Sequence, residues 1–98
     1  MNENKFQAQV IKDIKARLPG SMVLKNDSSY IQGIPDLMIL YEDKWAALEV
    51  KKNNHAHHQP NQDYYIQKMN NMSCAFFISP ENKEEVLNEL QSTLSVTR

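Results

Sequence analysis

Residues 33–51 read GIPDLMILYEDKWAALEVK, and this stretch decides the fold of the 98-residue chain. Proline is tolerated at the start of a strand, so Asp36 to Tyr41 is predicted to be a buried strand that begins just after Pro35. Residues 42–44 supply a polar turn, and Trp45 to Lys51 returns as a second apolar strand. The stretch is therefore predicted to form a β-hairpin.

The segment before the hairpin is predicted to hold one helix and one short strand. Residues Glu3 to Leu18 carry apolar side chains at four-residue steps and end at a Pro-Gly pair, which is typical of an amphipathic helix. Ser21 to Asn26 contains three consecutive apolar residues and is a strand candidate, although a weaker one. Residues 27–33 then supply the Asp, Ser and Gly residues of a loop.

The segment after the hairpin is predicted to alternate helix, strand and helix. Residues 52–59 are rich in Asn and His, and from Asn61 a helical stripe runs along the sequence through Gln62, Tyr65, Ile66 and Met69. Residues 75–78 are a short apolar strand, and Ser79-Pro80 followed by Glu81 is typical of a helix start. The fold class is thus α/β, a single domain over residues 1–98 with a mixed β-sheet flanked by helices in the order α-β-β-β-α-β-α.

The charge of the chain is nearly balanced, with 11 Lys and Arg against 12 Asp and Glu. A net charge of -1 argues against a large basic surface that grips nucleic acid, so any phosphate contact is expected to be local. Cys74 is the single cysteine and cannot form an intrachain disulfide, and the sequence shows no signal segment and no membrane-spanning apolar run. These features predict a soluble protein of the cytoplasm.

The hairpin carries three ionic residues that are candidates for catalysis. Glu49 and Lys51 are two positions apart and point to the same face of their strand. A two-residue loop at 42–43 or 43–44 would place Asp36 opposite Glu49 or Lys51, so that all three share one face. Charged residues at strand ends also commonly form a solvated rim, and the spacing alone does not decide between a catalytic cluster and such a rim.

Two facing carboxylates repel each other unless a proton or a metal ion lies between them. Hard oxygen ligands suit Mg²⁺ or Mn²⁺, and the backbone carbonyl of Val50 is a further candidate ligand. Such a cation supplies an activated water and neutralises phosphate charge, and Lys51 adds a cationic donor. The residue types in this pattern therefore favour hydrolysis of phosphodiester bonds.

The stretches Gly33-Ile34-Pro35-Asp36 and Glu49-Val50-Lys51 resemble the PD-(D/E)XK nuclease superfamily, and more narrowly its VRR-NUC branch. Glu3 on the first helix, Lys25 on the following strand and Gln62 after the polar loop occur in the order of that branch, and the resemblance covers nearly the whole chain. It implies a restriction-endonuclease-like fold. It also implies a stand-alone, phage-type DNA endonuclease that acts as a homodimer on branched DNA such as a Holliday junction, inside the host cell.

The resemblance also implies roles for individual residues. Asp36 and Glu49 would bind the metal directly, Lys51 would be the catalytic lysine, and Glu3 would be an outer ligand through water. Lys25 and Gln62 would contact substrate, although Lys25 could simply flank a strand and Gln62 could be a hydrogen-bond partner at the start of its helix. Lys52, Ser28 and Ser29 are further candidates for DNA contact, and turn chemistry explains the two serines equally well.

The remaining candidates have simpler explanations. His55, His57 and His58 lie in an Asn-rich loop and are expected to be solvated, because a closed zinc site needs about four convergent ligands. Trp45 and the pair Phe76-Phe77 lie inside strands and are expected to be core residues. Two other functions compete with the nuclease: a catalytically silent module that binds nucleic acid or protein, and a zinc-binding protein that uses the histidine loop.

Overall fold

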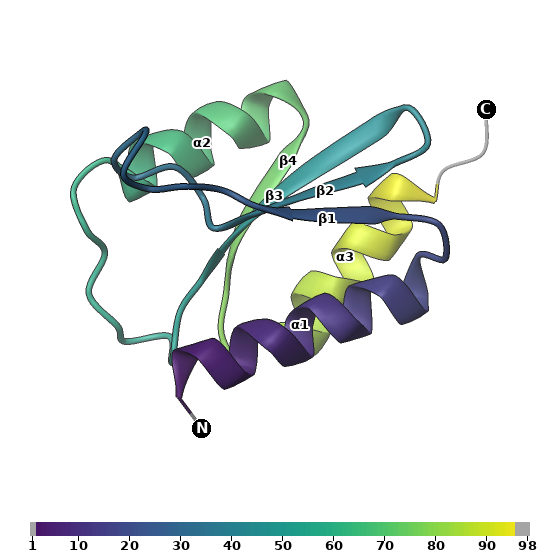
Figure 1. Ribbon diagram of the computed structural model, residues 1–98, viewed down its shortest axis with the longest axis horizontal. Helices are drawn as coiled ribbons and strands as arrows, with labels where there is room; N and C mark the ends of the chain where they lie inside the picture. Colours follow the sequence, from purple (N-terminus) through teal and green to yellow (C-terminus); the bar gives the residue numbers. More distant parts are fainter. Residues whose placement is uncertain (1, 96–98) are drawn as a thin grey trace.

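The computed structural model describes residues 2–95 and contains the predicted order of elements, α-β-β-β-α-β-α (Figure 1). The elements are α1 (Glu3–Arg17), β1 (Met22–Lys25), β2 (Leu37–Tyr41), β3 (Lys44–Val50), α2 (Gln62–Met72), β4 (Cys74–Ile78) and α3 (Lys83–Leu94). In the part of the chain that is described, no helix is long and apolar enough to cross a membrane.

The four strands form one mixed sheet in the order β1-β2-β3-β4. β1 and β3 both pair with β2 in antiparallel fashion, whereas β4 pairs with β3 in parallel. The parallel pair needs a crossover connection, and α2 provides it between β3 and β4. The α/β class and the mixed sheet predicted from the sequence are therefore confirmed.

Helices cover the two faces of the sheet unequally. α1 and α3 lie on one face, and α2 lies on the other (Figure 1). The hydrophobic core fills the space on the side of α1 and α3, and its largest fully buried side chains include Phe6, Ile14, Leu37, Ile39, Leu48, Ile78, Leu87 and Leu90. α2 has no fully buried residue and packs mainly against β3 and β4. The α2 side of β1 is consequently exposed, with Met22 at 57% and Leu24 at 42%.

Two predictions, about the last helix and about two aromatic side chains, were wrong in detail. The last helix begins at Lys83 and not at Ser79-Pro80, because Asn82 folds back on the end of β4 and accepts a hydrogen bond from the backbone N–H of Ser79 at 2.8 Å. Trp45 and Phe77 are only partly buried, since the face that they share is covered by α2 alone. Phe77 stacks on the His58 ring, with centroids 4.0 Å apart.

Candidate active site

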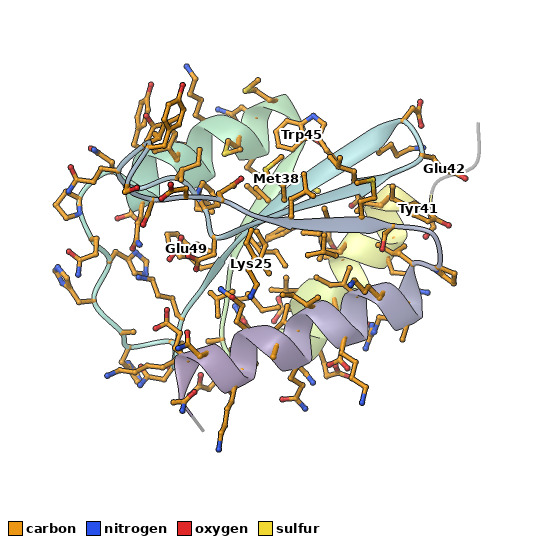
Figure 2. All side chains as sticks on the ribbon, in the orientation of Figure 1. Lys25, Met38, Tyr41, Glu42, Trp45 and Glu49 are labelled. Carbon is orange, nitrogen blue, oxygen red and sulfur yellow. The ribbon has the colours of Figure 1, made fainter. Side chains whose placement is uncertain are left out.

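The register of the β2–β3 hairpin decides which side chains share a face. Tyr41 pairs with Lys44 across a two-residue turn, and Leu37 pairs with Leu48. Asp36 directly precedes Leu37, so the same register carried one residue further places it opposite Glu49. Of the two loops considered from the sequence, the chain uses 42–43. Figure 2 shows Glu49 at the end of the hairpin remote from the turn at Glu42.

Backbone contacts hold Asp36 in place at the start of β2. Its Oδ2 accepts a hydrogen bond from the N–H of Val50 at 2.8 Å, which ties the carboxylate to the end of β3. Its backbone carbonyl accepts from the N–H of Asn26 at 2.8 Å, and the Asn26 side chain donates to the carbonyl of Pro35. The Asp36 carboxylate is thus fixed at the point where β1, β2 and β3 meet.

Glu49 is a buried carboxylic acid with one unsatisfied oxygen. Its exposure is 4%, and its Oε2 accepts a hydrogen bond from Gln62 Nε2 at 3.0 Å. Oε1 is buried and accepts no hydrogen bond from residues 2–95, whereas the protonated carboxyl group can hydrogen-bond to Asp36. Burial, together with the charge of the nearby Asp36 carboxylate and a hydrogen bond to it, raises the pKa of Glu49 to about 8, although Lys51 opposes the rise. Glu49 therefore holds a proton at neutral pH unless a cation replaces it.

Lys51 is held by three groups around its ammonium nitrogen. Nζ donates to Gln62 Oε1 at 2.6 Å and to the backbone carbonyl of His57 at 3.0 Å, and it lies 4.0 Å from Glu49 Oε2. The side chain is only 9% exposed. A lysine held in this way has lost the freedom of its four-carbon stem, so its charge stays next to the carboxylate pair.

Gln62 links the two ionic residues through one amide. Its Nε2 donates to Glu49, while its Oε1 accepts from both Lys51 and the backbone N–H of Gln59. Because two donors point at Oε1, the orientation of the amide is fixed by its hydrogen bonds. The sequence placed Gln62 beside the site as a candidate for substrate contact, and the structure shows that it also bridges Glu49 and Lys51.

These residues border a cavity of about 490 Å³ at the end of the sheet. Its lining residues are Glu3, Ser28, Gln32, Gly33, Ile34, Asp36, Glu49, Lys51, Lys52, Ala56, His57, Gln59 and Gln62. Four outer candidates from the sequence, Glu3, Ser28, Lys52 and Gln62, are thus brought to the same cavity as the three central residues. Gln32 and Gln59 were not predicted, because they lie in loops whose course the sequence does not define.

Two loops close one wall of this cavity through a contact at Gly33. A Cβ atom at Gly33 would lie 2.6 Å from the Cβ of Asn61 and 2.9 Å from the backbone oxygen of Pro60. Gly33 also has a φ of 89°, in the region that glycine favours. The loop before β2 and the loop after β3 therefore approach each other at a position where no side chain fits.

Two sequence candidates do not reach the cavity. Lys25 pairs with Leu37 and so lies on the α1 side of the sheet, whereas Met38 lies on the α2 side (Figure 2). Ser29 uses its N–H and hydroxyl to bind Asp27 Oδ1 within a turn. These positions give no support to the expected DNA contacts of Lys25 and Ser29, and for Ser29 they favour the turn reading.

The histidine loop shows no metal site. Within residues 2–95, no group of three or more His, Cys, Asp or Glu side chains is placed to hold a metal ion. His58 Nδ1 lies 2.8 Å from Asp63 Oδ1, and the His58 ring stacks on Phe77. His57 contributes its backbone carbonyl to Lys51. These contacts favour a structural role for the loop over the zinc alternative.

The fold and the cavity together define an α/β protein with a mixed four-stranded sheet and a paired-carboxylate hairpin. No protein-family sequence model matches the chain, and no curated protein matches it significantly. Solved structures do match it over nearly its whole length. One described as a "VRR_NUC domain protein" is 17% identical with a TM-score of 0.69, covering 97% of this chain and 89% of the other.

A second solved structure, described as a "VRR_NUC domain", is 20% identical with a TM-score of 0.71 and covers 92% of this chain and 94% of the other. The chain therefore has the fold of VRR_NUC domain structures, and the predicted resemblance is confirmed at the level of the fold. Because fold does not fix function, the roles of the side chains must come from the geometry of the site.

Proposed function

We propose that this protein is a metal-dependent DNA endonuclease of the VRR-NUC branch of the PD-(D/E)XK superfamily. The observation that carries the proposal is the arrangement of Asp36, Glu49 and Lys51 around one cavity. The two carboxylates lie opposite each other by the hairpin register, and the buried Lys51 ammonium is 4.0 Å from Glu49. A catalytically silent binding module would gain nothing from two closely spaced carboxylates, because the repulsion between them disfavours folding.

The residues present fit a Mg²⁺ or Mn²⁺ ion. When Glu49 is ionised, its buried Oε1 accepts no hydrogen bond from any residue that the structure describes, and a cation would satisfy it. Mg²⁺ is commonly held by one or two carboxylates and keeps several waters, so a protein cage of three acidic side chains is not needed. Asp36 and Glu49 would be the direct ligands, the carbonyl of Val50 would be a further one, and Glu3 would act through water.

The side chains of this chain supply specific parts of the hydrolysis. When bound, the cation supplies an activated water and neutralises charge on the phosphate. Lys51 would donate a hydrogen bond to the phosphate oxygens as negative charge develops on them. Gln62 holds Lys51 and Glu49 at a fixed separation, so neither must reorganise during the reaction. Lys52, exposed at the rim, would contact a neighbouring phosphate.

The expected substrate is DNA, and the expected form is a homodimer that acts on branched DNA such as a Holliday junction. The weak net charge of -1 supports this form, because one copy would grip a long duplex poorly. Two copies would double the few local phosphate contacts, and a branched substrate would present strands to both cavities.

Cleavage of labelled DNA by purified protein tests the proposal. Four-way junction, flap and plain duplex substrates would each be incubated with Mg²⁺, Mn²⁺ or EDTA. We expect metal-dependent cleavage by the wild type, loss of cleavage in Asp36→Asn and Glu49→Gln, and normal cleavage in Glu89→Gln, which removes an exposed carboxylate on α3. Metal-independent cleavage, or full activity in Glu49→Gln, would overturn the mechanism.

A further inference from the structure

A second cavity, of about 470 Å³, lies next to the candidate active site. Its lining residues are Asn26, Asp27, Tyr30, Ile31, Ile34, Met38 and Met69. Most of these side chains are apolar, in contrast to the charged and amide groups of the first cavity. The volume lies in the range of pockets that hold small organic ligands, roughly 300–1,000 Å³.

The two cavities share a wall. Ile34 borders both of them, and the loop that supplies Ser28 to the first supplies Tyr30 to the second. Asp36 and Met38 are two residues apart and so point to the same face of the sheet, separated by about 6.6 Å at the usual rise per strand residue. A DNA strand whose phosphate lies at Asp36 would therefore place an adjoining nucleotide beside the apolar cavity.

Tyr30 is the feature that the fold itself leaves unexplained. This residue is 84% exposed, the highest value among the exposed large hydrophobic residues within residues 2–95. It contributes nothing to the core, which lies on the other side of the sheet. The backbone around it is nevertheless organised, because its N–H donates to the carbonyl of Asp27 and the N–H of Ile34 donates to the carbonyl of Ile31. An exposed aromatic ring on an organised loop is a surface on which a planar ligand can stack.

We infer that this apolar cavity receives one unpaired nucleobase of the strand whose phosphate binds at Asp36 and Glu49. The inference rests on the proposed function and specifies its substrate. A base fits better than a second phosphate, because the Asp27 carboxylate borders the cavity and would repel an anion. Tyr30 would stack on the base, and Met38 and Met69 would contact its other surfaces.

This occupancy has a consequence for substrate choice. A base that is paired inside a duplex must be unstacked before it can enter a pocket, and this cost is smallest where the nucleotide is already unpaired. The chain is therefore expected to favour DNA with an unpaired nucleotide beside the cleaved bond, as at a flap, a fork or an opened junction, over a continuous duplex.

Binding of two single strands of equal charge tests the inference without requiring cleavage. One is a fluorescein-labelled twelve-nucleotide thymidine strand, and the other has the same phosphodiester backbone but abasic sugars throughout. Affinities would be measured by fluorescence anisotropy with Ca²⁺ in place of Mg²⁺. Phosphate contacts cancel in the ratio of the two dissociation constants, so the ratio reports the contribution of bases. We expect a ratio of roughly 5- to 150-fold for the wild type, as for stacking of one base on one aromatic ring.

Three variants locate that contribution. Tyr30→Ala should bring the ratio close to one, and Tyr30→Phe should keep it because the ring remains. Tyr64→Ala removes another exposed tyrosine, at 56% exposure on α2, and should leave the ratio unchanged. A wild-type ratio near one, or equal effects of Tyr30→Ala and Tyr64→Ala, would overturn the inference.

Two further outcomes separate this inference from the proposed function. Base-dependent binding without cleavage on any substrate would overturn the endonuclease and keep the base pocket, whereas cleavage with a ratio near one would do the reverse. If sedimentation shows that Tyr30→Ala converts a dimer to a monomer, the cavity is occupied by a second copy of the chain and the base pocket is wrong.

Discussion

Glu49 makes the stability of the metal-free protein depend on pH, and Glu49→Gln isolates this effect. Folding raises the pKa of Glu49 from 4.5 to about 8, because the carboxyl group is buried and faces Asp36. A group whose pKa is higher in the folded state contributes stability below its unfolded pKa and loses it as pH rises through the folded pKa. The free energy of unfolding should therefore fall between about pH 4.5 and about pH 8.

The size of this fall follows from the two pKa values. Each pH unit inside the window is worth about 1.4 kcal/mol, so at pH 7 the wild type has lost about 3 kcal/mol from this group. For a domain of this length, about 3 kcal/mol corresponds to a fall in Tm of roughly 10–20 °C. The amide in Glu49→Gln stays neutral, so the free energy of unfolding of this variant should increase relative to that of the wild type as pH rises.

Thermal unfolding followed by circular dichroism in EDTA, from about pH 5 to about pH 8, measures the difference. Other carboxyl groups titrate in both proteins, so the wild-type curve is compared with Glu49→Gln and with Glu89→Gln. We expect Glu89→Gln to follow the wild type. Mn²⁺ added in excess over EDTA near pH 8 should restore stability to the wild type and to Glu89→Gln but not to Glu49→Gln, because the cation takes the place of the lost proton. Parallel pH profiles for the wild type and Glu49→Gln would refute the reasoning.

Three further changes test other parts of the structure. Gly33→Ala should lower the free energy of unfolding by about 2 kcal/mol more than Gly20→Ala, because both glycines have φ near 90° but only Gly33 faces neighbouring backbone. Equal effects of the two substitutions in chemical denaturation would disprove the close contact at Gly33. Gln62→Leu should slow cleavage about 10- to 100-fold with little change in KM, because the amide positions Glu49 and Lys51; an unchanged rate would contradict this role. Ile39→Ala should lower the free energy of unfolding in urea by about 2–5 kcal/mol, whereas Met22→Ala, at a residue that is 57% exposed, should lower it little. Similar losses in the two variants would contradict the position of the core on the Ile39 side of the sheet.

Local sequence signals were sufficient for the fold. Pro35 at a strand start, the polar turn and the two apolar runs predict the hairpin, while helical stripes and short apolar runs elsewhere predict the remaining helices and strands. Each of these signals acts within a few residues, and together they give the order of elements that the structure has. The pairing of Asp36 with Glu49 depended on the turn, because a shift by one residue would have moved Asp36 to the opposite face. The sequence left two loops open, and the structure selects the one at 42–43.

Features that depend on packing between distant segments could not be predicted. Lys25 keeps the expected place in the order of elements, but its pairing with Leu37 puts it on the α1 side of the sheet. Phe77 looks like a core residue in sequence, yet only α2 covers its face, and the ring stacks on His58 instead. The apolar cavity at Tyr30 forms where a loop, a strand and a helix meet, so no local sequence pattern predicts it.

The most direct test of the central claim compares two adjacent lysines in single-turnover cleavage of labelled DNA at saturating protein and Mg²⁺. Lys51 is buried beside Glu49, whereas Lys52 is exposed at the rim of the same cavity. Lys51→Ala should retain its fold and lose about 100- to 1,000-fold in cleavage rate, since the donor to the developing charge is removed. Lys52→Ala should cleave at close to the wild-type rate under saturation. Full cleavage activity in purified Lys51→Ala would contradict the account.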